Sequence, residues 1–158
     1  MPKGKHLTLD ERVDIQVDLN EGRSFNRIAA DLGKDPSTIS KEVRAHIQKK
    51  RTGSYNPCQN VKECSHYGDL CRQCQISWGG DCRSCPYVKC FTRCPDFIQR
   101  TCRRLMSPPY VCNGCRERHG CRLERHIYDA KRAQSEYEET LRQSRQGFAI
   151  SPDELRRI

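Results

Sequence analysis

The chain of 158 residues is basic and polar, with 29 Lys and Arg against 20 Asp and Glu, a formal net charge of +9, and only 35% hydrophobic residues. This length predicts one or two small domains, and so little apolar material excludes a single large core. No apolar run approaches the length that crosses a membrane, and residues 1–10 lack the hydrophobic centre of an export signal. We therefore expect a cytoplasmic, nucleoid-associated protein without membrane contact, whose positive charge suits an anionic partner such as nucleic acid.

The first helix is expected to begin after Thr8. Glu11 completes a capping box with Thr8, in which each side chain bonds the backbone amide of the other residue. Residues 13–19 alternate apolar and polar side chains, which is typical of a strand. The cap favours a helix, which residues 20–22 should end.

Residues 24–47 predict two short amphipathic helices joined by a tight turn. The first helix has apolar residues at helical spacing, namely Phe25, Ile28, Ala29 and Leu32. Gly33 can take the left-handed conformation that ends a helix, and Asp35 and Pro36 suit the start of the next one. The inward residues of this second helix, over 36–47, are Ile39, Val43 and Ile47. Two helices joined in this way form a helix-turn-helix.

The outward face of the second helix combines hydroxyls with cations, and a basic run follows it. The residues that we expect to contact DNA are Ser37, Thr38, Ser40, Lys41, Arg44, Lys49, Lys50 and Arg51. Ser, Thr, Arg and Lys side chains reach base edges in a major groove, and cations beyond the helix can reach the phosphate backbone. A helical hairpin whose charged face is only solvated is the alternative. The basic run and the lack of large apolar residues on this face favour double-stranded DNA as the partner.

Residues 51–122 form a cysteine-rich segment in which prolines and glycines interrupt every apolar run. It holds all twelve cysteines of the chain: Cys58, Cys64, Cys71, Cys74, Cys82, Cys85, Cys90, Cys94, Cys102, Cys112, Cys115 and Cys121. Three pairs are separated by two residues, a spacing that recurs in structural zinc sites because two thiolates on a tight turn can face one tetrahedral ion. In a reducing cytosol, metal ligation is favoured over disulfides.

Twelve thiolates suffice for about three zinc ions with four ligands each. In sequence order the three sets are Cys58, Cys64, Cys71 and Cys74; Cys82, Cys85, Cys90 and Cys94; and Cys102, Cys112, Cys115 and Cys121, and cross-braced sets are equally allowed. Three such sites would bring the formal charge of residues 58–122 from +6 to about zero. Iron–sulfur clusters, disulfides and a zinc site with His66 or His119 are the rival interpretations. We expect metal removal to unfold this segment and to leave residues 9–47 folded around a small core of their own.

Residues 123–147 predict a long helix with a heptad-like seam. The seam residues are Leu123, Ile127, Ala130, Gln134, Tyr137 and Leu141, of which Gln134 is a polar interruption. The helix over 123–145 would either form a homodimer or dock on the cysteine-rich segment, and the sequence favours neither. Residues 148–158 begin a further helix that stops after about two turns, so we expect them to belong to a longer polypeptide.

The segments KHLTLDERVDI, RSFNRIAADLGKDPSTISKEVR, CPDF, PPYVCNGC and AQSEYEETLRQSR together resemble the N-terminal region of bacterial insertion-sequence transposases of the IS-thirty family. The resemblance covers nearly the whole chain and is most specific in DPSTISKEV. It implies recognition of the terminal inverted repeats of a mobile element, with a DNA-reading helix that carries Thr38, Ser40, Lys41 and Arg44. In that family an RNase H-like core with an Asp-Asp-Glu triad follows, and arginine is common where this chain has Lys41.

Taken together, the sequence predicts a mainly α protein in four parts. These are a three-helix helix-turn-helix domain (1–50), an irregular zinc-binding module (51–122), a long helix (123–147) and the start of a truncated helical segment (148–158). The predicted function is sequence-specific binding to element ends in DNA transposition. The chain itself should not be an enzyme, because nothing after Lys50 resembles the hydrophobic strands that hold catalytic carboxylates. A zinc-stabilised protein-interaction scaffold, or a transcriptional repressor derived from such a transposase, is the alternative.

Overall fold

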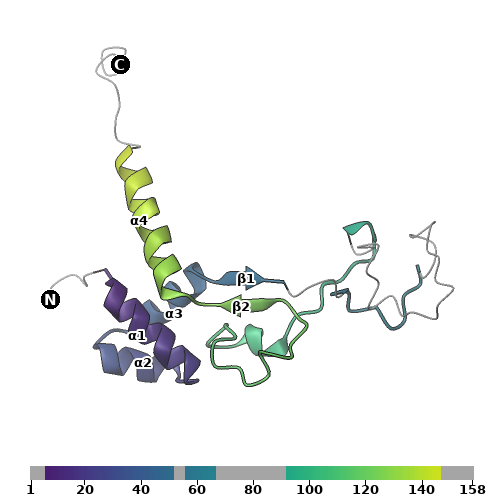
Figure 1. The fold of residues 1–158 in the computed structure, drawn as a ribbon, viewed down its shortest axis with the longest axis horizontal. Helices are drawn as coiled ribbons and strands as arrows, with labels where there is room; N and C mark the ends of the chain where they lie inside the picture. The colour runs from purple at the N-terminus through teal and green to yellow at the C-terminus, as the bar shows by residue number, and fades with distance from the viewer. Residues whose placement is uncertain (1–5, 52–55, 67–91, 147–158) are drawn as a thin grey trace, which may run out of the picture.

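The computed structural model of the chain describes residues 6–51, 56–66 and 92–146. Its elements in chain order are α1 (Leu9–Asn20), α2 (Phe25–Leu32), α3 (Pro36–Ala45), β1 (Gln48–Lys50), a short 3-10 helix (Arg103–Met106), β2 (Arg125–Ile127) and α4 (Ala130–Gln146). The α-helices gather at one end of the molecule, and β1 and β2 lead from them toward an extended arm (Figure 1). The mainly helical fold with three N-terminal helices is as predicted, whereas the segment 148–158 lies outside the described residues.

Local signals set the helix boundaries in the first fifty residues. Thr8 and Glu11 form the expected capping box, in which the Thr8 amide donates to Glu11 Oε2 (2.8 Å) and the Glu11 amide to Thr8 Oγ1 (3.2 Å). Gly33, with a φ of 61°, ends α2 in the left-handed conformation, and the side chain of Asp35 caps α3. Helix α3 ends before Ile47, which packs half-buried against the core instead of continuing the helix.

Helix α1 accommodates the strand-like alternation of residues 13–19. Ile15 and Leu19 lie one turn apart and are fully buried, while Val13 and Val17 are 41% and 48% exposed. Apolar residues occupy every second position in this stretch, but only one apolar residue per turn faces the core. The prediction of a helix, which rested on the cap, is confirmed.

Strands β1 and β2 form a two-stranded antiparallel ribbon that we did not predict. Residues 48–50 pair with residues 125–127. The prediction that a long helix begins at Leu123 is therefore wrong, because α4 begins only after β2. Residues 125–127 form a strand and not the first turn of a helix because their backbone groups pair with β1. Strand β2 bonds β1 through backbone groups, and its His126 carbonyl accepts a further hydrogen bond from the Cys112 amide (2.6 Å).

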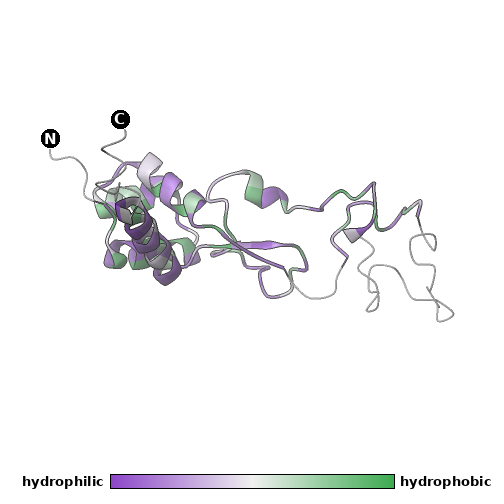
Figure 2. Ribbon diagram, turned by 90° about the horizontal axis from the view of Figure 1, so that it is seen from above, coloured by the Kyte–Doolittle hydropathy of each residue, from purple (hydrophilic) through white to green (hydrophobic). Residues whose placement is uncertain are grey.

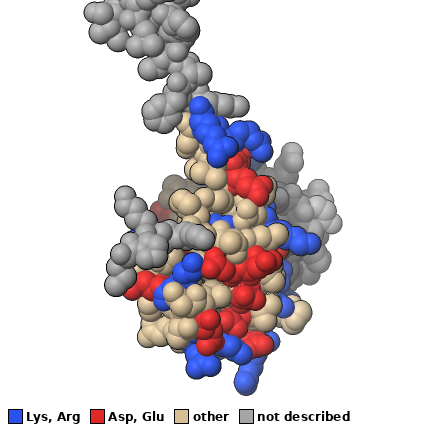
Figure 3. Space-filling view, turned by 90° about the vertical axis from the view of Figure 1, so that its left-hand side faces the viewer, with Lys and Arg blue, Asp and Glu red and all other residues tan. Residues whose placement is uncertain are grey.

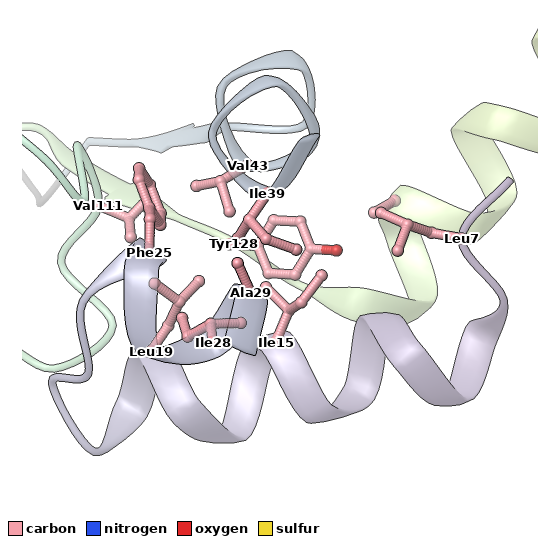
Figure 4. Packing of buried hydrophobic residues seen from close by; sticks show 11 residues of the cluster. Leu7, Ile15, Leu19, Phe25, Ile28, Ala29, Ile39, Val43, Val111 and Tyr128 are labelled. Carbon is pink, nitrogen blue, oxygen red and sulfur yellow. The ribbon is translucent and has the colours of Figure 1, made fainter. Parts of the chain in front are cut away.

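The hydrophobic core joins stretches of the chain that were predicted to be separate domains (Figure 4). Its buried members are Leu7, Ile15, Leu19, Phe25, Ile28, Ala29, Ile39, Val43, Val111, Tyr128 and Ala133. Val111 comes from the cysteine-rich segment, Tyr128 follows β2, and Ala133 lies on α4. The core expected within residues 9–47 is thus completed from outside that span, and the helical end is one packed unit.

Beyond this unit, the described chain forms an arm of residues 56–66 and 92–100. Seen from above, the ribbon connects the helices to this arm (Figure 2). The Gln59 amide donates to the Ile98 carbonyl and the Arg100 amide to the Pro57 carbonyl, both at 2.7 Å, so the two stretches of the arm run antiparallel. Among the described helices, none is long and apolar enough to cross a membrane.

Candidate nucleic-acid interface

Helix α3 turns its predicted DNA-binding residues away from the core. Ile39 and Val43 are fully buried. The predicted contact residues on this helix are exposed at Ser37, Thr38, Lys41 and Arg44 and half-buried at Ser40. The Ser37 amide donates to the carboxylate of Asp35 (2.8 Å) and secures the first turn. Hydrogen bonds from the Ser37 side chain and from this amide lower the pKa of Asp35. The helix therefore offers hydroxyls near its N-terminus and cations further along.

The turn between α2 and α3 is fixed both to itself and to α1. The Lys34 amide donates to the Ala29 carbonyl (2.9 Å), and Lys34 Nζ lies 3.0 Å from Glu11 Oε1. Burial raises the pKa of Glu11, but hydrogen bonds from Thr8 and Lys34 outweigh it and lower the pKa overall. The first helix thus holds the turn that sets the direction of α3.

Arg44 is positioned by an aromatic ring from the cysteine-rich segment. The guanidinium carbon of Arg44 lies 5.3 Å from the centroid of the Tyr110 ring, a cation–π distance. The same ring lies 6.2 Å from the ring of Phe25 on α2. Tyr110 has a φ of 61°, in the left-handed region that residues other than glycine seldom adopt. Tyr110 was not among the predicted site residues, and its place beside Val111 in a short apolar stretch was the only local signal for it.

The ribbon extends the cationic surface beyond α3. Lys49 and Lys50 are exposed on β1, and Lys50 lies directly opposite Arg125 on β2. Like charges in register disfavour strand pairing unless an anion lies between them, and a DNA phosphate would supply one. Arg51 is engaged elsewhere, because its Nε lies 3.4 Å from the carboxylate of Glu124. The structure therefore groups Lys49 and Lys50 with α3 and places Arg51 at the base of the arm.

A buried ionic network under α3 fixes this helix against α1 and α4. Arg12 is 2% exposed and donates through Nε to Glu42 Oε1 (2.7 Å) and through Nη1 to the Leu7 carbonyl and to Gln134 Oε1. The Tyr128 hydroxyl donates to the same carboxylate (3.1 Å), and burial followed by the Glu42 charge raises the pKa of Tyr128 far above its usual range. Gln134, the polar interruption of the predicted seam, is thus a partner of the buried arginine.

The seam of α4 faces the first helix. The guanidinium carbon of Arg12 lies 4.8 Å from the centroid of the Tyr137 ring. The Ala130 amide at the start of α4 donates to Gln16 Oε1 (2.6 Å), and Ala133 is fully buried in the core. The structure therefore shows the seam docked on α1, a partner that we had not considered for it.

The end of α3 is also tied to α4. His46, which follows the last helical residue, lies 2.7 Å through Nδ1 from Glu136 Oε2. Hydrogen bonding to His46, with a further contribution from Arg132, lowers the pKa of Glu136. The ionised form of Glu136 is therefore the form that the folded chain favours.

Acidic residues gather on one face of the helical end. Figure 3 views the molecule from the side of α1 and α2 and shows Asp and Glu side chains concentrated down the middle of this face. The exposed carboxylates of α1 and its C-terminal turn are Asp10, Asp14 and Glu21. A DNA backbone would be repelled from this face.

The cysteines that the structure describes are all free thiols. They are Cys58, Cys64, Cys94, Cys102, Cys112, Cys115 and Cys121. The remaining predicted ligands, Cys71, Cys74, Cys82, Cys85 and Cys90, lie outside the described residues. Within the described ranges, no group of three or more His, Cys, Asp or Glu side chains is arranged as a metal site. His66 pairs with Asp96 (2.7 Å), and His119 is exposed. The expectation of about three zinc ions therefore stays a prediction.

Three N-terminal helices, a glycine-terminated second helix and a third helix with its polar face outward define a helix-turn-helix protein. Residues 3–46 match the family model described as a helix-turn-helix domain. The chain is 39% identical over 84 residues to a protein from Lactobacillus acidophilus named "Uncharacterized 14.4 kDa protein in laf 3'region". The match covers 47% of this chain and 68% of that protein, and the chain belongs to its family. No solved structure matches the chain.

Proposed function

We propose that the protein binds double-stranded DNA with α3 in a major groove, and that it recognises specific sequences at the ends of a mobile element as part of a transposase. The helix-turn-helix family that residues 3–46 match is found in transposases. The chain's own segments that resemble the IS-thirty family support the narrower proposal. Such a protein would act in the cytoplasm, at the nucleoid.

The observation that carries the proposal is the two-sided character of α3. Its inward residues are fully buried at Ile39 and Val43, so the helix cannot rotate to hide its polar face. That polar face has Ser37 and Thr38 in the first turn, the part of a recognition helix that usually lies closest to base edges. Its later positions carry cations that reach bases or phosphates.

The ribbon adds a second contact of a different kind. Lys49 and Lys50 follow α3 directly, are exposed, and lie opposite further basic side chains on β2. Lysines on a short strand are suited to phosphates and not to base edges. We therefore assign specificity to α3 and sequence-independent affinity to the ribbon.

Footprinting of the full chain on the DNA that flanks its gene tests this proposal. We expect protection of a short segment within an inverted repeat and no protection of a scrambled duplex of equal composition. Lys41→Ala should weaken the footprint, whereas Lys131→Ala, an exposed lysine on α4 outside the interface, should not. Equal binding to both duplexes, unaffected by Lys41→Ala, would contradict recognition by α3.

A zinc-stabilised protein-interaction scaffold is the second candidate. The exposed Val13 and Val17 on α1 favour it, because apolar side chains at helical spacing can receive a partner. It predicts no protection of any DNA fragment at moderate salt. A homodimer through residues 123–145 is a further proposal, which sedimentation of the full chain tests directly.

A further inference from the structure

A pair of cysteines lies in the turn that packs under the helix-turn-helix. In the sequence Cys-Asn-Gly-Cys, the amide of Cys115 donates to the carbonyl of Cys112 (3.1 Å), which closes a tight turn. Cys112 is buried and Cys115 half-buried. Arg104 Nη1 donates to Cys115 Sγ at 3.3 Å, so one sulfur already has a cationic partner.

Two further cysteines belong to the surroundings of this turn. Cys102 directly precedes the short 3-10 helix that carries Arg104, the residue that contacts Cys115. Cys121 closely follows Arg118, whose amide donates to the Cys115 carbonyl (3.2 Å). The four cysteines are the third set of the sequence-order assignment, and the only set that lies wholly within the described residues. These four side chains are not arranged as a metal site in the described structure, so the proposal requires rotation of the cysteine side chains about their Cα–Cβ bonds.

The same turn is in close contact with the end of α1. A Cβ atom on Gly114 would lie 2.6 Å from the Leu19 carbonyl oxygen and 2.8 Å from the Cα of Gly22, so only glycine fits. The side chain of Asn113 bonds both Asn20 Oδ1 (3.2 Å) and the Tyr128 carbonyl (2.9 Å). The shape of the Cys-Asn-Gly-Cys turn is therefore coupled to the turn between α1 and α2.

We propose that Cys102, Cys112, Cys115 and Cys121 bind one zinc ion, and that this ion holds the turn in the shape that supports the helix-turn-helix. Four soft thiolates are the ligand set that tetrahedral zinc prefers in structural sites. A zinc ion with four thiolates carries a net charge of −2, and the Arg104 guanidinium is placed to offset part of it. The sequence-based expectation was that residues 9–47 stay folded without metal. The proposal reverses that expectation.

Zinc content of single and double variants tests the shared site. In the full chain purified under reducing conditions, Cys102→Ser, Cys112→Ser and Cys121→Ser should each lose about one equivalent of zinc. The double variant Cys102→Ser/Cys121→Ser should lose no more than either single variant, because both residues serve one ion. Additive losses in this double variant, or no loss in the single variants, would overturn the proposal.

Cobalt substitution keeps the assignment testable if a serine variant fails to fold. In Cys121→His the site should keep one metal ion, and its cobalt spectrum should change from that of four thiolates to that of three thiolates and one imidazole. An unchanged cobalt spectrum would show that Cys121 is not a ligand.

Hydrogen exchange tests the coupling to the helices. The amides of Gly22 and Arg23, which donate to the carbonyls of Leu19 (3.1 Å) and Asp18 (3.0 Å), report on the turn between α1 and α2. Chelation of zinc should speed their exchange on the order of tenfold or more. Unchanged protection after complete removal of zinc would overturn the structural role of the ion.

Two glycine variants separate the metal site from the packing contact. Gly114→Ala should loosen the Gly22 and Arg23 amides while zinc content stays at the parent level, because the added methyl meets the backbone of α1 and not the sulfurs. Gly120→Ala, where a Cβ meets nothing within 4 Å, is the matched control and should change neither. If the Gly22 and Arg23 amides exchange as slowly in Gly114→Ala as in the parent chain, the coupling between the two turns is contradicted. None of these measurements involves DNA, so their outcome is independent of the proposed function.

Discussion

Arg12 and Glu42 meet beneath α3, where Arg12 Nε donates to Glu42 Oε1 at 2.7 Å and both side chains are shielded from water. Arg12 lies on α1 and Glu42 on the inner side of the helix that we assign to DNA. The pair therefore holds α3 in place, and its directional hydrogen bond fixes the orientation of this helix more specifically than apolar contacts would. Buried ion pairs of this kind are costly to break, because the remaining charge has no water to replace its partner.

Replacing Arg12 by Met should destabilise the fold by about 3–5 kcal/mol, since the buried Glu42 carboxylate would keep only the Tyr128 hydroxyl (3.1 Å) and the more distant His46 Nε2 (3.8 Å) as described partners. Adding Glu42→Gln to Arg12→Met should recover part of this loss, because the uncompensated charge is then gone. Urea unfolding of the single and double variants measures both effects. Arg27→Met, which removes an exposed arginine paired with Asp31, is the control and should cost less than about 1 kcal/mol. A loss as small as the control in Arg12→Met would contradict the role of the network.

Glu136 should make stability depend on pH in the acidic range. Its hydrogen bond to His46 lowers the pKa of the folded state below the ordinary value of 4.5, so ionised Glu136 stabilises the fold above that value. The contribution is lost as the pH falls through the lower, folded pKa. Because the Glu136 side chain is 40% exposed, Glu136→Gln should cost less than about 1 kcal/mol at pH 6.

The difference between the parent chain and Glu136→Gln should vanish once both carry a neutral side chain at low pH. Thermal unfolding at a series of pH values measures this convergence. The exposed residue Glu63 of the arm supplies the control, and Glu63→Gln should match the parent at every pH. A deficit of Glu136→Gln that grows as the pH falls would reverse the sign and contradict the prediction.

Arg44 should depend on the Tyr110 ring for its DNA contact. Arg44→Ala should weaken binding to the specific site by about 1–3 kcal/mol if the guanidinium contacts a base. Tyr110→Leu keeps the apolar volume but removes the ring face, and should weaken binding by about 0.5–1 kcal/mol through loss of the cation–π contact. Tyr110→Phe keeps the ring and should bind as the parent does. Fluorescence anisotropy at fixed salt compares the three variants, and equal affinities for Tyr110→Leu and Tyr110→Phe would show that the ring does not position Arg44.

Lys49 should contribute to affinity on any sequence. Lys49→Ala should weaken binding to specific and scrambled duplexes by similar factors and reduce the slope of log affinity against log salt by about 1. Titrations at several salt concentrations measure this slope. Lys62→Ala, on the exposed surface of the arm, serves as the control. A loss confined to the specific duplex would reassign Lys49 to base recognition.

The chain should bind element ends without cutting them. We expect no nicking or strand transfer with magnesium or manganese, because two-metal chemistry needs carboxylates held together on a rigid scaffold. A supercoiled plasmid carrying the inverted repeat provides the assay. Metal-dependent nicking by the pure chain, abolished by a change of one carboxylate, would contradict this prediction.

Features with local causes could be predicted from the sequence. The caps at Thr8 and Asp35 and the left-handed Gly33 depend on residues within one turn of each other, so their sequence neighbours suffice to identify them. The exposed positions of α3 followed from the same short-range pattern. Lys41 and Arg44 are therefore where they were expected.

Features that depend on distant partners could not be predicted in this way. Strand β2 is a strand because β1 pairs with it from far away in the sequence, and its own residues had suggested a helix. A buried arginine at position 12 is likewise not foreseeable from a helical pattern alone. Gln134 was the one available signal, since a polar residue inside an apolar seam needs a polar partner.

The ion pair between Arg51 and Glu124 stands where the chain leaves the ribbon and where it returns. The two ends of the segment between Arg51 and Glu124 therefore lie side by side. The entropic cost of closing such a loop rises only slowly with the number of residues in it. Insertions and deletions in the outer arm can accumulate without moving α3, whereas the stretch around Gly114 is fixed by its contact with α1. We expect relatives of this chain to differ in the length of the arm far more than in the spacing between their helices, and a foreign peptide inserted in the outer arm to leave the helical end intact.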